Sequence, residues 1–204
     1  KLQAPSHMGG AWIVNGEIDI IDDEGKLWVT YKVEIMIPED YPNTLPQLKE
    51  IGGQIERTDD WHINFNGTCC LAPDAEIYRR LKGKLTLLNW VNEFARPFLA
   101  NHYLKIKTGS YANGEYNHGA GGLVQYYSKL FGLNDIQEVI SMLGLIIGNI
   151  KQSRNLPCFC GSGKKYKRCF VMEPNNHRFD VPLKVLSNDF MTLKRNYTAK
   201  GLSN

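Results

Sequence analysis

Hydrophobic and polar residues alternate along the first part of the chain. Every second residue from Leu27 to Ile37 is apolar or aromatic, which is the period of a β-strand with one buried face. The preceding stretch, WIVNGEIDII at 12–21, alternates in part, and DDEG at 22–25 has the composition of a hairpin turn. Three prolines in residues 38–46 exclude helix and central strand there, and QLKEIGG at 47–53 offers one more short strand. The pattern predicts an antiparallel meander.

The period changes to that of an α-helix in the second half of the chain. Four apolar residues from Leu87 to Phe98 share one helical face, and Pro97 is expected to kink or end that helix. GGLVQYYSKLFG at 121–132 predicts a short helix closed by Gly132, and Asn134 with Gln137 resembles a capping box that opens another. The apolar stripe of this last helix, predicted to be packing surface, is Ile136, Val139, Ile140, Leu143, Ile146, Ile147 and Ile150.

Strands followed by helices predict an α+β fold. A chain of 204 residues can bury a full core and carry a small appendage. The 43% hydrophobic and 22% charged fractions are those of a globular protein, and a net charge of +3 gives no argument for a nucleic-acid partner. The longest apolar run, ISMLGLII at 140–147, is too short to span a membrane, so we expect no membrane partner.

The five cysteines form two groups, Cys69 with Cys70, and Cys158, Cys160 and Cys169. An odd number without a secretory signal argues against a disulfide framework and favours thiol chemistry plus a metal in a reducing compartment, by default the cytoplasm. The adjacent pair lies in a turn-rich segment, where it could be a redox pair, half of a metal site, or a reactive thiol with an inert neighbour. A disulfide between adjacent cysteines would be strained.

Four short motifs occur in order around this pair. They are Pro38, Tyr41, Pro42 and Pro46 in IPEDYPNTLP, then HIN at 62–64, GTCCL at 67–71, and Trp90. Together they resemble the ubiquitin-conjugating (UBC) enzyme family over about residues 11–99. Ile63 stands where the family has proline, and the spacing from His62 to Cys70 is about two residues tighter. The chain begins at Lys1, and the family's N-terminal helix is expected to be missing from it.

The resemblance implies a UBC-like fold and a role for each of three residues. Cys70 directly precedes Leu71, as the family's nucleophile precedes a leucine, whereas Cys69 holds a position usually filled by an aliphatic residue. Asn64 is assigned as the amide donor that stabilises the oxyanion when an amine or thiol attacks the thioester. His62 is assigned the family's structural role of bracing the loop.

The activity implied is acyl transfer. Cys70 would accept the C-terminal carboxyl group of a protein as a thioester and pass it to an amine. The sequence shows no glycine-rich phosphate loop, so either a separate activating enzyme exists or none is needed. Bacterial enzymes of this kind occur in CBASS anti-phage operons, where the resemblance implies that the carrier is the C-terminus of a cGAS-like nucleotidyltransferase; a ubiquitin-like protein stays open as the alternative carrier.

Two other functions stay open. The chain could be an inactive UBC-like binding module, or a thioesterase or protease that uses Cys70 with His62 as base.

A second motif lies near the C-terminus. PCFCGSGKKYKRCF at 157–170 resembles the SEC-C motif, a zinc knuckle of the pattern Cys-x-Cys, eight residues, Cys, then Cys or His. The resemblance implies a structural zinc held by Cys158, Cys160 and Cys169. Position 170 is phenylalanine, so His177 is the candidate for the fourth ligand. The basic cluster KKYKR belongs to the knuckle pattern and is not taken as a nucleic-acid site.

These segments predict four parts. They are a UBC-like catalytic core at 1–104, a helical extension at 105–152, a zinc knuckle at 153–178 and a polar tail at 179–204.

Overall fold

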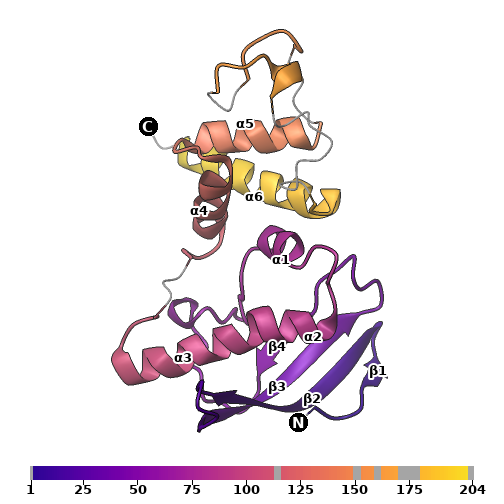
Figure 1. Ribbon diagram of the computed structural model, residues 1–204, viewed down its shortest axis with the longest axis vertical. Coiled ribbons are helices and arrows are strands. Elements are labelled where there is room, and N and C mark those ends of the chain that lie inside the picture. The colour runs from indigo at the N-terminus through magenta and orange to yellow at the C-terminus, as the bar shows by residue number, and fades with distance from the viewer. Residues whose placement is uncertain (1, 113–115, 149–152, 159–161, 170–179, 202–204) are drawn as a thin grey trace. The chain divides into compact units, whose positions relative to one another are not determined.

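The computed structural model describes residues 2–112, 116–148, 153–158, 162–169 and 180–201. The chain divides into two compact units, the first made of Lys1–Ala72 and Gly83–Glu115, the second of Pro73–Lys82 and Tyr116–Asn204. The first unit holds a four-stranded antiparallel sheet with helices, and the described part of the second is built around helices (Figure 1). The predicted α+β class is therefore confirmed.

The sheet is a meander with the order β1-β2-β3-β4. Its strands are β1 Ser6–Met8, β2 Ala11–Ile21, β3 Leu27–Pro38 and β4 Gln47–Glu50. The three longer strands are those that the sequence predicts, whereas β1 has only three exposed residues and no alternation to detect. Asp22 closes the predicted turn between β2 and β3, since its Oδ1 accepts hydrogen bonds from the backbone N–H groups of Glu24 and Lys26 at 3.1 and 2.8 Å.

One face of the sheet carries the core of the first unit. The register sets Val14 opposite Ile35 and Ile18 opposite Tyr31, and all four side chains are buried. Helix α3, Arg96–Thr108, covers this face of β2 and β3 (Figure 1). The other face is polar and carries the ion pair of Lys49 with Glu34 at 3.2 Å. Alternate burial along β3 thus follows from its two-residue period.

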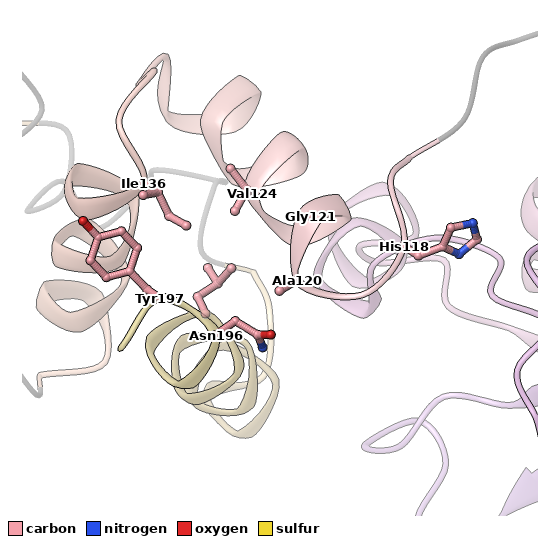
Figure 2. A pocket seen from close by; sticks show the side chains of 8 residues that line it. His118, Ala120, Gly121, Val124, Ile136, Asn196 and Tyr197 are labelled. Atoms are coloured by element: carbon pink, nitrogen blue, oxygen red, sulfur yellow. The ribbon is translucent and has the colours of Figure 1, made fainter. Parts of the chain in front are cut away.

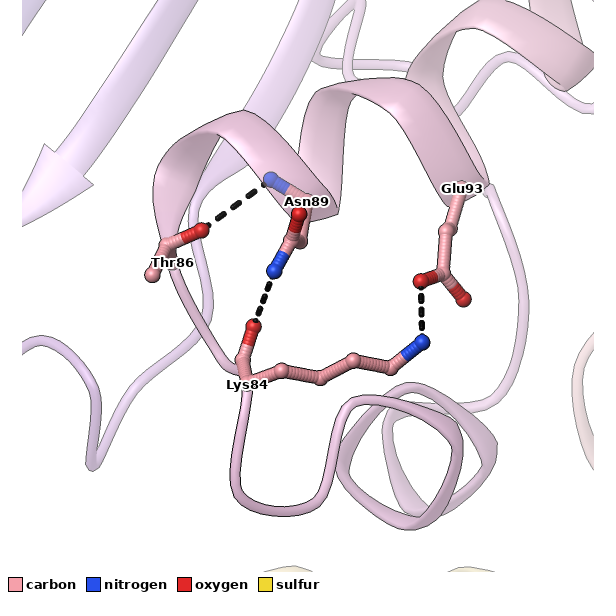
Figure 3. A network of polar contacts seen from close by, with 4 residues as sticks. All are labelled: Lys84, Thr86, Asn89 and Glu93. Carbon is pink, nitrogen blue, oxygen red and sulfur yellow. Dashed lines mark hydrogen bonds and ion pairs between the residues drawn. The ribbon is translucent and has the colours of Figure 1, made fainter.

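The helical segment that contains Pro97 continues beyond this residue instead of ending there, and the irregularity next to the proline is a π-helical turn. Helix α2 (Leu87–Trp90) begins at Thr86, whose side chain accepts a hydrogen bond from Asn89 N–H at 3.2 Å (Figure 3). It continues through the π-helical turn η2, Val91–Ala95, into α3. In a regular α-helix the proline ring would clash with the carbonyl group four residues back, and the wider π turn makes room for it.

Four helices of the second unit are described: α1 Asp74–Arg80, α4 Ala120–Phe131, α5 Ile136–Ile146 and α6 Leu183–Gly201. Helices α4, α5 and α6 pack against one another, and α1 packs against α6. Gly132 closes α4 in the left-handed conformation, as predicted. Asp135, not Asn134, caps α5, because its carboxylate accepts hydrogen bonds from the N–H groups of Gln137 and Glu138. None of the described helices combines the length and the apolar character that a membrane span requires.

Two expectations about the second unit differ from the structure. Met142 and Leu145 of α5 are buried while Ile136 and Ile140 are partly exposed, so the buried face is rotated from the predicted stripe. Ile150 lies outside the described residues. The expected polar tail at 179–204 contains α6, which buries Leu186, Phe190 and Leu193. The boundary expected at 104 also falls inside α3.

A part-buried carboxyl group links α4 to α6 through a hydrogen bond and makes the stability depend on pH. Tyr127 OH donates a hydrogen bond to Asp189 Oδ2 at 2.7 Å. Burial, with a smaller contribution from the charge of Asp74, raises the pKa of Asp189 from 3.8 to about 6, although the Tyr127 bond acts in the opposite direction. Between these values the folded state binds more protons than the unfolded state. Stability from this group is therefore lost as the pH rises through 6.

Asp189→Asn is expected to remove this loss, because an amide oxygen still accepts the Tyr127 bond and carries no charge. At pH 8 the free energy of unfolding should rise by about 1 to 3 kcal/mol, and at pH 4 it should not rise. Denaturant unfolding at both pH values measures the difference, with the exposed Glu138→Gln as the control in the same unit. Equal destabilisation by Asp189→Asn at the two pH values would contradict the assignment.

Candidate active site

The segment with the two adjacent cysteines forms a short hairpin. The 3₁₀ turn η1, Asp59–Trp61, ends at His62, which takes the left-handed conformation with φ 52°. The chain then doubles back, with Ile63 paired to Cys69 and the N–H of Cys70 donating to the carbonyl oxygen of His62 at 2.8 Å. The turn is closed by Gly67 N–H to Asn64 O at 2.8 Å, and Gly67 has φ 83°, where glycine is favoured.

This hairpin continues the sheet beyond β4. Thr68 pairs with Lys49, and the N–H of Cys69 donates to the carbonyl oxygen of Leu48 at 2.8 Å. Because neighbouring residues of an extended chain face opposite sides, Cys69 is buried and Cys70 is exposed, both as thiols. The opposite burial of the two cysteines is therefore a direct result of the pairing.

Burial makes Cys69 a poor nucleophile. It raises the pKa of the Cys69 thiol to about 12; a hydrogen bond with the backbone of Glu50 acts in the opposite direction, and the charge of Glu50 adds a smaller increase. The reactive form of cysteine is the thiolate, which at neutral pH is then on the order of one part in ten thousand or less at this residue. Of the adjacent pair, Cys70 is the thiol that a reactant in solvent can reach.

Asn64 is exposed, as Cys70 is, while Ile63 and Cys69 are buried. Its amide nitrogen donates to Thr68 Oγ1 at 2.9 Å, and this hydroxyl donates to Asn66 Oδ1 at 2.7 Å. The bond to Thr68 fixes the direction of the amide and uses one of its two hydrogens. The role of Asn64 as oxyanion donor stays a prediction.

His62 contributes to the hairpin through both backbone and side chain. Its carbonyl oxygen accepts the Cys70 N–H, and its buried ring packs edge-on against Tyr111, with ring centroids 5.7 Å apart. Such contacts are typical of a residue that holds a loop in place. The assignment of His62 as structural rather than catalytic stays a prediction.

A buried carboxylate at the end of β4, which the sequence analysis missed, also shapes this region. Glu50 is 5% exposed, and its two oxygens accept hydrogen bonds from the N–H groups of Gly52 at 2.6 Å and Gly53 at 3.0 Å. A Cβ atom on Gly52 would lie 2.7 Å from Glu50 Oε1, so a side chain at this position would displace the Glu50 carboxylate from its present place. The sequence signal for this arrangement is EIGG at 50–53, in which an acidic residue shortly precedes two glycines.

Two of the predicted zinc ligands lie in a hydrogen-bonded turn in the second unit. The N–H of Cys158 donates to Lys164 O, and that of Tyr166 donates to Leu156 O, both at 2.8 Å. Cys158 and Cys169 are buried, and both lie close enough to Tyr166 for their charges to raise its pKa, after the larger effect of burial. Cys160 and His177 lie outside the described residues. Among the described residues no three ligand-type side chains converge.

A hollow of about 270 Å³ opens between α4, α5 and α6 (Figure 2). Most of the side chains that line it are apolar. Two of its polar side chains make hydrogen bonds within the protein: Asn196 donates to Thr192 O at 2.9 Å, and Tyr197 OH accepts from Gln137. The ring of His118 points away from the hollow (Figure 2). We therefore assign it no ligand.

Comparison with known protein families finds the SEC-C motif at residues 154–169. This motif is of a zinc-binding type, and the match confirms the predicted C-terminal motif. It covers a small part of the chain and leaves the class of the sheet-bearing unit open. No curated protein and no solved structure matched the chain.

Proposed function

We propose that this protein is a ubiquitin-conjugating-like acyltransferase whose nucleophile is Cys70. The observation that carries the proposal is the hairpin at residues 62–70, which is bonded to the sheet and exposes the Cys70 thiol while burying that of Cys69. An accessible thiol on a hydrogen-bonded hairpin that also carries an exposed asparagine fits what thioester exchange requires. The four UBC-like motifs around the hairpin support the same assignment.

The proposed reaction has two steps. The Cys70 thiolate attacks the activated carboxyl carbon of a protein C-terminus, so that a C–S bond forms and the activating group leaves. An amine then attacks this carbon, the amide bond forms, the thiolate leaves, and the amine loses a proton. Each step passes through a tetrahedral oxyanion, and the Asn64 amide would donate to it. One such donor typically contributes a factor of about 100 or more.

The carrier in this proposal is the C-terminus of a cGAS-like nucleotidyltransferase or of a ubiquitin-like protein. A separate enzyme would activate the carboxyl group, and the reaction would take place in the cytoplasm as part of anti-phage defence of the CBASS type. This context rests on the UBC-like motifs of the sequence.

We further propose a structural zinc in the SEC-C motif. The two described thiols, Cys158 and Cys169, are buried in one turn beside Tyr166, which fits a thiolate site. Cys160 and His177 would complete the ligand set. The metal would cross-link a turn of few apolar residues and thereby stabilise it.

Cys70→Lys is expected to trap the carrier, because an amine at this position converts a labile thioester into a stable amide. The variant, expressed with the genes beside its own, should give an adduct that survives hydroxylamine and reducing agent, and mass spectrometry should place the carrier's C-terminus on residue 70. The control is a double variant that carries both Cys70→Ala and Phe65→Lys. It removes the thiol and puts an amine on the fully exposed tip of the same turn. It should give no adduct.

Other outcomes of this experiment would contradict the proposal. A binding module forms no covalent adduct with either the wild type or Cys70→Lys. A hydrolase removes the partner's terminal residues in a Cys70-dependent manner without transferring them to lysine.

A further inference from the structure

Lys105, on the last turn of α3, is held out of solvent by aromatic rings. Its side chain is only 12% exposed, and its ammonium nitrogen lies 4.5 Å from the ring centroid of Trp61 and 4.3 Å from that of Tyr111. The same nitrogen donates to the carbonyl oxygen of Asp60 at 2.5 Å. Helix lysines usually extend into water, so a cation enclosed in this way fixes the groups around it.

His102 holds the next carbonyl group of the same segment. Its Nε2 lies 2.7 Å from the carbonyl oxygen of Trp61, and its Nδ1 lies 2.7 Å from that of Phe98. Tyr111 OH lies 3.2 Å from the same Nε2. Lys105 and His102 therefore anchor two successive carbonyl groups, those of Asp60 and Trp61, to α3.

These anchored groups directly precede the residue that pairs with the nucleophile. His62 follows Trp61, its ring packs against Tyr111, and its carbonyl oxygen accepts the N–H of Cys70. A continuous set of contacts thus runs from Lys105 through Tyr111 and His62 to the backbone of Cys70. None of Lys105, His102 and Tyr111 belongs to the UBC-like motifs of the sequence.

We infer that Lys105 is a positioning residue for Cys70, and this inference rests on the proposed acyl transfer. Without its charge, the Asp60 carbonyl group and both rings lose their shared partner, while His102 still holds Trp61. We expect the hairpin to keep its fold and to lose the fixed position of Cys70 and Asn64. The loss should therefore fall on the rate of transfer rather than on binding of the acceptor.

The test compares Lys105→Met with Lys107→Met. Methionine keeps an aliphatic stem and removes the charge, and Lys107 is a matched control because its nitrogen lies over Tyr103 of the same helix at 5.6 Å. The probe is a synthetic peptide thioester of a small thiol. Cys70 attacks its carbonyl carbon, a new C–S bond forms, the small thiol leaves, and free lysine then takes the acyl group.

Lys105→Met should lower the single-turnover rate of transfer to lysine, followed by intact mass, at least tenfold, with the half-saturating lysine concentration unchanged. Lys107→Met should match the wild type, and Lys105→Arg should recover most of the rate. A second readout needs no transfer: the rate of Cys70 alkylation by iodoacetamide should change at least threefold in Lys105→Met and not in Lys107→Met.

The two readouts separate failure of this inference from failure of the proposed function. Wild-type rates for both readouts in Lys105→Met would overturn the inference and leave acyl transfer standing. A wild type that loads the peptide but does not transfer it would contradict the proposed function. The alkylation rates would then still test whether Lys105 positions Cys70. If Lys105→Met does not fold, Tyr111→Leu, which removes one ring, should slow transfer and alter alkylation. Unchanged rates in that variant would overturn the inference.

Discussion

Cys70→Ala is expected to abolish every covalent conjugate of this protein, whereas Cys69→Ala should leave most of the activity. The two residues are adjacent, but Cys69 is bonded to Leu48 of β4 and has a buried thiol, whereas Cys70 is bonded to His62 within the hairpin and has an exposed one. Burial also holds the pKa of Cys69 at about 12, so its thiolate is scarce at neutral pH. Conjugates sensitive to reducing agent, separated by electrophoresis and mapped by mass spectrometry, measure the outcome.

Stability must be controlled in this comparison. Removing the buried sulfur atom of Cys69 leaves a small cavity, which should lower the free energy of unfolding by about 1 kcal/mol. Truncating the exposed Cys70 should change stability by less than about 0.5 kcal/mol. Thermal unfolding therefore sets a temperature at which both variants are folded. An adduct on Cys69, or full activity of both variants, would refute Cys70 as the nucleophile.

Metal analysis is expected to give one zinc per chain in the wild type and well under half an equivalent in Cys158→Ser. Each thiolate contributes strongly to a tetrahedral zinc site, and a serine hydroxyl does not replace it. Ser162→Ala is the matched control, because the Ser162 hydroxyl lies 3.9 Å from the Cys169 sulfur but is no predicted ligand. It should retain the metal.

The same experiment can contradict the zinc proposal. A wild type with well under half an equivalent of zinc, unaffected by Cys158→Ser, would remove the metal from the motif. His177→Ala tests the fourth ligand, since loss of zinc in this variant is expected only if the imidazole binds the ion.

The sheet was predictable from sequence because its two long strands have one buried face each. Alternation along residues 27–37 survives in the structure as burial of Tyr31, Val33 and Ile35, with Val29 half-buried. The turn at 22–25 was predictable because an aspartate that accepts two backbone hydrogen bonds is a local feature.

The missed features depend on residues far apart in sequence. Helix α6 has its apolar residues Leu186, Phe190 and Leu193 among many polar ones, and they become core only where α4 and α5 cover them. Contacts of Lys105 with Asp60, and of His102 with Trp61, span more than forty residues. No local pattern encodes such pairs. The sequence placed the nucleophile at Cys70 because it precedes Leu71, whereas the burial of Cys69 accompanies its pairing with Leu48 of a distant strand.

Helix α1 has a consequence for dissecting this protein. It begins four residues after Cys70, belongs to the second unit, and buries Ala75, Ile77 and Tyr78 there before the chain returns to the first unit at Gly83. The two units are thus interleaved along the chain rather than arranged one after the other. A fragment truncated at residue 115 would retain α1 without the α6 surface on which it packs. Such a fragment would expose the apolar side chains of α1 and tend to aggregate, so point variants in the full chain are the sound way to assign the roles of each unit.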